Sequence, residues 1–328
     1  MVSTSPTTRT EYDHDVVIVG GGPAGCSAGV FTAREGLDTA VFDRGRSSIQ
    51  RCAHLENYLG FPEGADIETF YDLIHDHAET AGCTVVPDLV ESVDRPDDDA
   101  ADGFVITSQE SEPVTARRVI AATRYDGEYL RGLDSNEAMF ETCDHDNEAD
   151  DRFDRDYPDA DGSTPVEGLY VASPAGKPDK QAILAAGRGA RVGKRVVADA
   201  RIDDGWWESV AAGVDWVRQQ SELDDEWAER ANWVEWFDDF YGEAAPVDPD
   251  SDRFERVRET YIDDRFDGYL TDAEIDRRAE EAHETLADHL DPEAIVAAVD
   301  TDQLLAAIDD DAIRAYRDDD QQSGLDAQ

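Results

Sequence analysis

Residues 16–25 read Val-Val-Ile-Val-Gly-Gly-Gly-Pro-Ala-Gly, and this stretch decides the fold. Four apolar, strand-forming residues lead into the spacing Gly-x-Gly-x-x-Gly from Gly20, and an alanine-rich segment that favours a helix follows. A second apolar run, 39–42, ends at Asp43. The order strand, glycine turn, helix, strand and acid is typical of a dinucleotide-binding βαβ unit.

Each element of this unit has a physical role. The first glycine permits the tight turn, the second lets the backbone approach a diphosphate, and the third lets the helix pack close to the strand. The free N–H groups and the positive dipole end of the helix would face the phosphates. The Asp43 carboxylate can accept hydrogen bonds from both ribose hydroxyls of an adenosine. The alternative is a glycine turn in an ordinary βαβ unit. The residues predicted to contact the dinucleotide here are Gly20, Gly22, Pro23, Ala24, Gly25, Asp43 and Arg44.

The net charge of the chain limits the kinds of partner that it can bind. The 328 residues include 78 Asp and Glu but only 29 Lys and Arg, which gives a formal net charge of −49. Such a charge repels nucleic acid. It suits a surface solvated at very high salt, where self-repulsion is screened, so we expect a protein of halophilic type. The alternative is an acidic docking face for a basic partner.

Several sequence patterns that would indicate other classes of protein are absent. No run of about 18 apolar residues predicts a membrane span, and the polar start of the chain shows no signal-peptide pattern. The four cysteines form no Cys-x-x-Cys pair. We therefore expect a cytoplasmic protein, and we predict no metal site. Cys26, in the first helical turn, is either a small packed residue or a thiol of lowered pKa.

Several further segments occur in an order that resembles the thioredoxin-reductase branch of the FAD-dependent pyridine nucleotide-disulfide oxidoreductases. Besides the glycine motif, they are Glu56-Asn57-Tyr58-Leu59-Gly60-Phe61-Pro62, Val119–Thr123, Thr164–Ala172 and the helix-compatible run from Lys180 to Ala190. The resemblance covers about residues 13–200. It implies an FAD cofactor, and the further FAD-binding residues that it implies are Asn57, Ala122, Thr123, Ser173, Gln181 and Ala182.

The chain also departs from that family. A nicotinamide domain is inserted in the family between the segments matched by Thr123 and Thr164, but the interval here is too short for a domain of about 100 residues. The redox pair is matched only by Phe140 and Cys143, which cannot form an intramolecular disulfide. Ser173-Pro174 replaces the glycine and aspartate that hold the ribityl chain.

Two further positions bear on the cofactor. Arg124 stands where the family has a glycine. Lys180 is either a cation near the flavin pyrimidine or a plain surface lysine.

The remainder, from residue 201, is helical by composition and shows no internal repeat. Its six tryptophans, between Trp206 and Trp236, predict a helix-packing core or else a cap over the flavin or a dimer face. The domain prediction is a disordered tail 1–12, an FAD domain 13–124 plus 164–200, an acidic loop 125–163, a helical domain 201–317 and an acidic tail 318–328.

The sequence thus predicts an α/β protein with one FAD-binding Rossmann-like domain of three layers, followed by an all-α domain. We expect an oxidoreductase whose chemistry is centred on the flavin, with no catalytic side chain identified. Its expected partners are a protein electron donor or acceptor and a second copy in a homodimer. The alternatives are a non-catalytic FAD- or nucleotide-binding protein and an NAD-binding βαβ unit.

Overall fold

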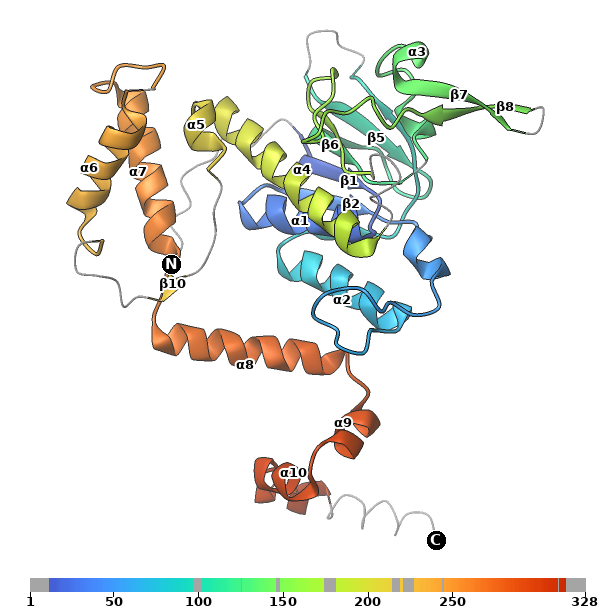
Figure 1. Ribbon diagram of the computed structural model, residues 1–328, viewed down its shortest axis with the longest axis vertical. Helices are drawn as coiled ribbons and strands as arrows, with labels where there is room; N and C mark the ends of the chain where they lie inside the picture. The colour runs from blue at the N-terminus through green and yellow to red at the C-terminus, as the bar shows by residue number, and fades with distance from the viewer. Residues whose placement is uncertain are drawn as a thin grey trace. The chain divides into compact units, whose positions relative to one another are not determined.

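The computed structural model describes residues 12–96, 102–124, 126–145, 148–173, 181–213, 219–220, 227–243, 245–311 and 313–316. The predicted tails 1–12 and 318–328 therefore lie almost wholly outside the described residues, as do Pro174 and Lys180. The chain divides into two compact units, Met1–Asp272 and Ala273–Gln328, here called unit 1 and unit 2 (Figure 1).

A seven-stranded sheet forms the centre of unit 1. Its parallel strands are β1 (His14–Val19), β2 (Thr39–Phe42), β3 (Thr84–Val86), β6 (Val114–Ala121) and β9 (Leu169–Val171). The antiparallel strands β4 (Val90–Asp94) and β5 (Phe104–Ser108) extend it beside β6. Because β1 lies between β2 and β6, the glycine turn that follows it opens at the middle of the sheet edge.

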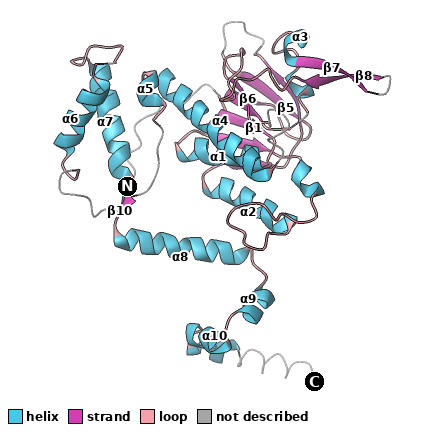
Figure 2. Cartoon of the chain, in the orientation of Figure 1, coloured by secondary structure: helices cyan, strands magenta, loops and turns pink. Residues whose placement is uncertain are grey.

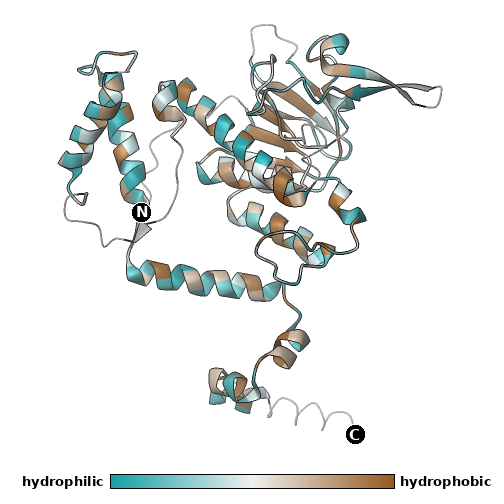
Figure 3. Cartoon of the chain, in the orientation of Figure 1, coloured by the Kyte–Doolittle hydropathy of each residue, from teal (hydrophilic) through white to brown (hydrophobic). Residues whose placement is uncertain are grey.

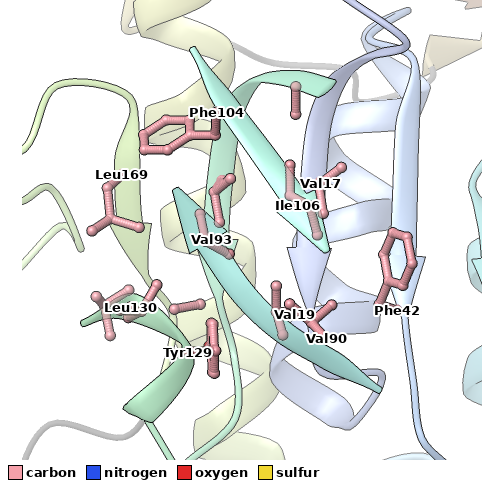
Figure 4. Close-up of a cluster of buried hydrophobic side chains, with 14 of the residues drawn as sticks. Val17, Val19, Phe42, Val90, Val93, Phe104, Ile106, Tyr129, Leu130 and Leu169 are labelled. Atoms are coloured by element: carbon pink, nitrogen blue, oxygen red, sulfur yellow. The ribbon is translucent and has the colours of Figure 1, made fainter. Parts of the chain in front are cut away.

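The two faces of the sheet carry different cores, as the alternation of side chains along a strand requires. Val16 and Ile18 face α1 (Pro23–Arg34) and α4 (Ala182–Asp203). Val17 and Val19 face the other way, into a cluster with side chains of β4 and β5 (Figure 4). The α/β class and the parallel Rossmann-like core are confirmed.

Backbone contact holds α4 against α1. A Cβ added at Gly189 would lie 2.0 Å from the carbonyl oxygen of Ala24, and one at Gly193 would lie 2.8 Å from that of Ala28. The two helices can approach this closely only because α4 has no side chains at these positions. The start of α4 is thereby fixed relative to the glycine turn.

Residues 126–163 differ from the acidic loop that we expected. They contain η2 (Glu128–Leu130), α3 (Asn136–Met139) and an antiparallel hairpin of β7 (Phe140–His145) and β8 (Glu148–Phe153), seen in Figure 2. The rings of Phe140 and Phe153 pack edge to face with centroids 5.8 Å apart. These apolar anchors give the acidic sequence a fixed structure. Cys143 lies in β7, opposite Asp150.

The boundary predicted at residue 201 is also wrong, because unit 1 continues to Asp272. The short α5 (Glu208–Ala211) and the helices α6 (Arg230–Tyr241) and α7 (Asp252–Asp267) share one core with Ala198 of α4. Trp206 and Trp207 are buried in it, and Trp233 and Trp236 pack against it. The prediction of a helix-packing core is confirmed for these four tryptophans, whereas Trp216 lies outside the described residues.

Two-residue strands, β10 (Gln219–Gln220) and β11 (Tyr269–Leu270), pair in the same region. Elsewhere in unit 1, η1 (Ser48–Arg51) and α2 (Ile67–Thr80) follow β2.

No helix within the described residues is long and apolar enough to cross a membrane. Those residues also contain no group of three side chains that could hold a metal ion.

Unit 2 contains α8 (Asp272–Asp288), α9 (Pro292–Ala298) and α10 (Thr301–Ala307), and none of these helices has a buried residue. Figure 3 shows apolar and polar residues alternating along them. Asp291, Asp300 and Asp309 each accept a hydrogen bond from the backbone N–H two residues later. These caps recur every nine residues, so the expectation of no repeat was wrong for this segment.

Candidate functional site

The glycine turn is closely packed against its surroundings. Gly20 has a φ of +112°, and a Cβ at Gly25 would lie 1.8 Å from the carbonyl oxygen of Gly20. The Gly20 N–H donates to the Phe42 carbonyl at 2.8 Å, which ties the turn to β2. Gly20 and Gly25 thus have the conformational and steric roles that the motif assigns to them.

The N-terminus of α1 is open to a ligand. Its cap residue is Gly22, no side chain caps it, and Pro23 follows as the first helical residue. The first hydrogen bond of the helix runs from the Cys26 N–H to the Gly22 carbonyl at 3.0 Å. The N–H groups of Ala24 and Gly25 precede this bond and have no partner within the helix, which is the arrangement that binds a diphosphate.

Asp43 follows β2, and its side chain is only 6% exposed. The Tyr71 hydroxyl donates to its Oδ2, and His75 Nε2 lies 3.3 Å from the same oxygen. Oδ1 accepts a hydrogen bond from the Gly45 N–H at 3.1 Å. The carboxylate that we expected to bind both ribose hydroxyls is therefore already engaged by side chains of α2.

The pKa values of this cluster describe an ion pair. Burial alone would raise the pKa of Asp43, but the hydrogen bonds from His75, Tyr71 and Gly45 outweigh it and hold that pKa below its usual value. Burial alone would lower the pKa of His75, but Asp43, Cys26 and the Gly21 carbonyl raise it to about 10. At neutral pH the pair is a carboxylate beside an imidazolium.

The ends of β6 and β9 lie next to each other, as β6 and β9 pair in parallel. The Ser173 hydroxyl accepts from the Arg124 N–H at 3.0 Å. The Thr123 hydroxyl donates a hydrogen bond to the Asp126 carbonyl. Its oxygen also lies 2.9 Å from the phenol oxygen of Tyr129. Arg124 has a φ of +56°, the left-handed conformation that glycine adopts without strain. The backbone at Arg124 thus keeps the left-handed conformation that favours the glycine found at this position in the family.

Asn57 and Gln181 meet although 124 positions separate them in the sequence. Asn57 Nδ2 donates to Gln181 Oε1 at 2.7 Å. Gln181 is the residue that precedes the first turn of α4, and Ala182 packs against the same buried cluster as Tyr58 and Phe61. The two segments that the family resemblance assigns to the flavin are therefore in direct contact.

The structure thus gathers most of the predicted cofactor residues at one edge of the sheet. The turn residues Gly20, Gly22, Pro23, Ala24 and Gly25 follow β1, Asp43 and Arg44 follow β2, Ala122 and Thr123 follow β6, and Ser173 follows β9. Arg44 is exposed and lies 3.9 Å from Asp126. Tyr71 and His75 were missed. They are four positions apart on α2, a spacing that indicates a shared helix face but not the carboxylate opposite.

A separate cavity of about 660 Å³ lies at the opposite edge of the sheet, where β6 and β9 begin. Its lining includes Arg117 and Arg118, which both donate to Asp203 Oδ2 at the end of α4. The ion pairs in its wall join the last turn of α4 to β6. The cavity is distinct from the glycine turn.

Residues 14–151 match the family described as pyridine nucleotide-disulphide oxidoreductase. A thioredoxin reductase from Streptomyces clavuligerus is 35% identical over 83 residues, which are 24% of this chain and 26% of the relative. One from Listeria monocytogenes is 34% identical over 118 residues, 34% of each chain. Residues 14–151 are thus similar to the pyridine nucleotide-disulphide oxidoreductases, and a stretch of about 80–120 residues of the chain is similar to thioredoxin reductases.

A thioredoxin reductase from Gloeobacter violaceus superposes with a TM-score of 0.44 and 17% identity, covering 59% of this chain and 95% of that one. The T. acidophilum thioredoxin reductase superposes with a TM-score of 0.44 and 18% identity, covering 58% of this chain and 100% of that one.

The region that matches the family model runs from β1 into β8, so it includes the glycine turn, Asp43, Asn57 and Thr123. Ser173 and Gln181 lie beyond it. The chain spans about a quarter to a third of the length of these curated relatives. The hydrogen bond between Asn57 and Gln181 joins this region to the start of α4, in addition to the packing of α1 on α4.

Proposed function

We propose that the chain binds FAD at this edge of the sheet and that the flavin is the redox centre of an oxidoreductase without an intramolecular dithiol. The observation that supports this most directly is the hydrogen bond between Asn57 and Gln181. It joins two segments that the family resemblance assigns to the flavin. Both are exposed, and Gln181 lies eight residues before the point where α4 touches the first turn of α1.

The residues present fit such a cofactor. The uncapped first turn of α1 would hold the diphosphate, and Asp43 Oδ1 would accept a ribose hydroxyl. Large apolar side chains close to the Asn57–Gln181 contact in sequence are exposed, namely Leu59 at 89%, Leu184 at 46% and Ile183 at 37%. An apolar ring lying on them would remove this surface from water. When bound, FAD would supply the capacity to accept and release two electrons.

Two of the three thiols whose side chains the structure describes, Cys26 and Cys83, are buried and give no competing redox site. Burial raises the pKa of Cys26, and burial with the neighbouring Cys26 raises that of Cys83 to about 12, so both stay protonated at neutral pH. Cys52 is exposed, and the sequence contains no Cys-x-x-Cys pair. Electrons would therefore pass between the flavin and a small substrate or a partner protein.

The setting and assembly are part of the same proposal. The acidic composition supports a cytoplasm of high salt, and a protein electron donor or acceptor is the expected partner, with a homodimer as a further expectation. These features set the conditions of the experiment, which must be done at multimolar KCl.

The first test is the visible spectrum of the protein purified in that salt, before and after incubation with FAD. We expect a bound flavin at one per chain. Asn57→Ala should weaken FAD binding about 10-fold, because one hydrogen bond near the ring is lost. Glu56→Ala, an exposed neighbour, is the matched control and should bind as the unaltered protein does. A protein that takes up no flavin refutes the proposal.

The second candidate is a non-catalytic FAD- or nucleotide-binding protein. The engaged carboxylate of Asp43 and the strained Arg124 favour it, since both depart from an unobstructed cofactor site. Photoreduction of the bound flavin, followed by stopped-flow mixing with quinones, disulfides and ferricyanide, separates the two. A flavin that binds but is reoxidised by none of these acceptors supports the second candidate.

A further inference from the structure

A buried polar cluster lies directly behind the glycine turn. It consists of Asp43 after β2, Tyr71 and His75 on α2, and Cys26 on α1. The rings of Tyr71 and His75 lie with centroids 4.4 Å apart. His75 Nε2 lies 2.8 Å from the Gly21 carbonyl, which also accepts from the Cys26 thiol at 3.2 Å. The cluster therefore connects α2 to the turn that would hold the phosphates.

The two oxygens of Asp43 are not equivalent. Oδ2 is bonded by the Tyr71 hydroxyl and approached by His75, whereas the bond found for Oδ1 within the described residues is the one from Gly45. A carboxylate oxygen has about two acceptor positions. Oδ2 is thus filled from the protein interior, and Oδ1 retains one position.

The orientation of the carboxylate follows from these contacts. The hydrogen bond from Tyr71 to Oδ2 and the bond from Gly45 to Oδ1 restrict the rotation of the carboxyl group, and the imidazolium beside Oδ2 stabilises a charge that burial would otherwise disfavour. The packing at Gly21 restricts it further, because a Cβ added there would lie 2.6 Å from the Asp43 Cβ.

We propose that Tyr71 and His75 are positioning residues of the nucleotide site, which hold Asp43 so that Oδ1 receives one ribose hydroxyl rather than both. This inference rests on the proposed function. It assigns α2 a role in recognising the adenosine half of the ligand. It also predicts that the two hydroxyls of the ribose are not equivalent for binding.

The probes are ADP, 2′-deoxy-ADP and 3′-deoxy-ADP, titrated against the full chain at multimolar KCl and neutral pH. We expect one deoxy analogue to bind at least 10-fold more weakly than ADP and the other within about 3-fold, since a hydrogen bond to a charged group is lost in one case only. In Tyr71→Phe, Oδ2 gains a free acceptor position, so both analogues should bind more weakly than ADP. Equal losses for the two analogues in the unaltered protein would overturn the proposal.

A pH series tests the role of His75. The groups that face it are Asp43, Cys26 and the Gly21 carbonyl, and the Tyr71 ring packs beside it. ADP affinity should fall several-fold as the pH rises towards 10, because His75 then loses its proton, and His75→Gln should remove this dependence while retaining a donor. Cys26→Ala should keep it, which assigns it to His75. His77→Gln, an exposed histidine on the same helix, is the matched control.

The outcomes distinguish this inference from the proposed function. If the unaltered protein binds neither ADP nor FAD, both fail. If it binds FAD but Tyr71→Phe and His75→Gln match it in analogue preference and pH profile, this inference alone fails. Should either variant not fold, the C2–H resonance of His75 in the unaltered protein provides the answer. Its titration should shift with saturating ADP, and an unshifted titration overturns the inference.

Discussion

Replacing Gly189 by alanine should loosen the contact that fixes α4 on α1. The added Cβ would lie 2.0 Å from the Ala24 carbonyl oxygen and 2.8 Å from the Ala24 carbonyl carbon. Backbone atoms cannot yield as a flexible side chain can. The helices must therefore separate by about 1 Å or more to reach ordinary contact, near 3.5 Å between heavy atoms.

The expected cost follows from two opposing effects. Overpacking a close contact costs typically about 1–3 kcal/mol, and more where backbone must move. Alanine in place of glycine in a helix returns up to about 1 kcal/mol. We expect a net loss of about 1–3 kcal/mol in the free energy of unfolding. For a domain of this size, that corresponds to a fall in Tm of roughly 2–10 °C.

Gly187 provides the control, because it is in the same helix and has no atom within 4 Å of an added Cβ. Gly187→Ala should raise the free energy of unfolding by up to about 1 kcal/mol. Both variants would be unfolded thermally and with guanidinium chloride at fixed high salt, and their FAD affinity would be measured. If Gly189→Ala is as stable as Gly187→Ala, the reasoning about the α1–α4 contact is refuted.

Three further predictions concern single side chains. Between pH 6.5 and about 10 only the folded state keeps the proton on His75, so this residue's contribution should be complete below pH 6.5 and lost by about pH 10. The free energy of unfolding of the unaltered protein should fall across that range relative to His75→Gln, by at most about 1.4 kcal/mol per pH unit; parallel pH curves would contradict it. Arg124→Gly should stabilise the chain by up to about 1 kcal/mol in guanidinium unfolding, because it relieves the left-handed conformation; a destabilised variant would show that the arginine side chain outweighs the strain. Arg118→Gln should cost about 1–3 kcal/mol, since this side chain is only 5% exposed, whereas Arg117→Gln, at 39%, should cost about 0.5 kcal/mol or less; equal costs, measured by thermal unfolding, would contradict the ranking.

Local patterns in the sequence predicted the parts of the fold that are local. The glycine spacing and the apolar runs on either side of it were enough for β1, α1 and β2. A position of both Asn57 and Gln181 near one cofactor was expected from the family resemblance, but their direct hydrogen bond was not predicted. Where a family pattern was present, long-range placement could be inferred.

The errors arose where packing overrides composition. Residues 140–153 are acidic and were predicted as a loop, but two phenylalanines at the hairpin base pack together and order the strands. The boundary at 201 was wrong because the burial of Trp206 and Trp207 joins the helices after it to the end of α4. The partners of Asp43 were missed because the pattern of an amphipathic helix does not say which polar group it will face.

Because α4 is held in close contact with α1 at Gly189, the length of the first two turns of α4 sets where the Gln181 side chain lies. Gln181 precedes Gly189 by eight residues, so the amide stands about 12 Å along the axis from the point where the helices touch. One residue inserted between them would rotate that amide by about 100° and turn it away from Asn57, even if every buried contact survived. Evolution can therefore vary the chemistry of the seven positions between Gln181 and Gly189 far more readily than their number.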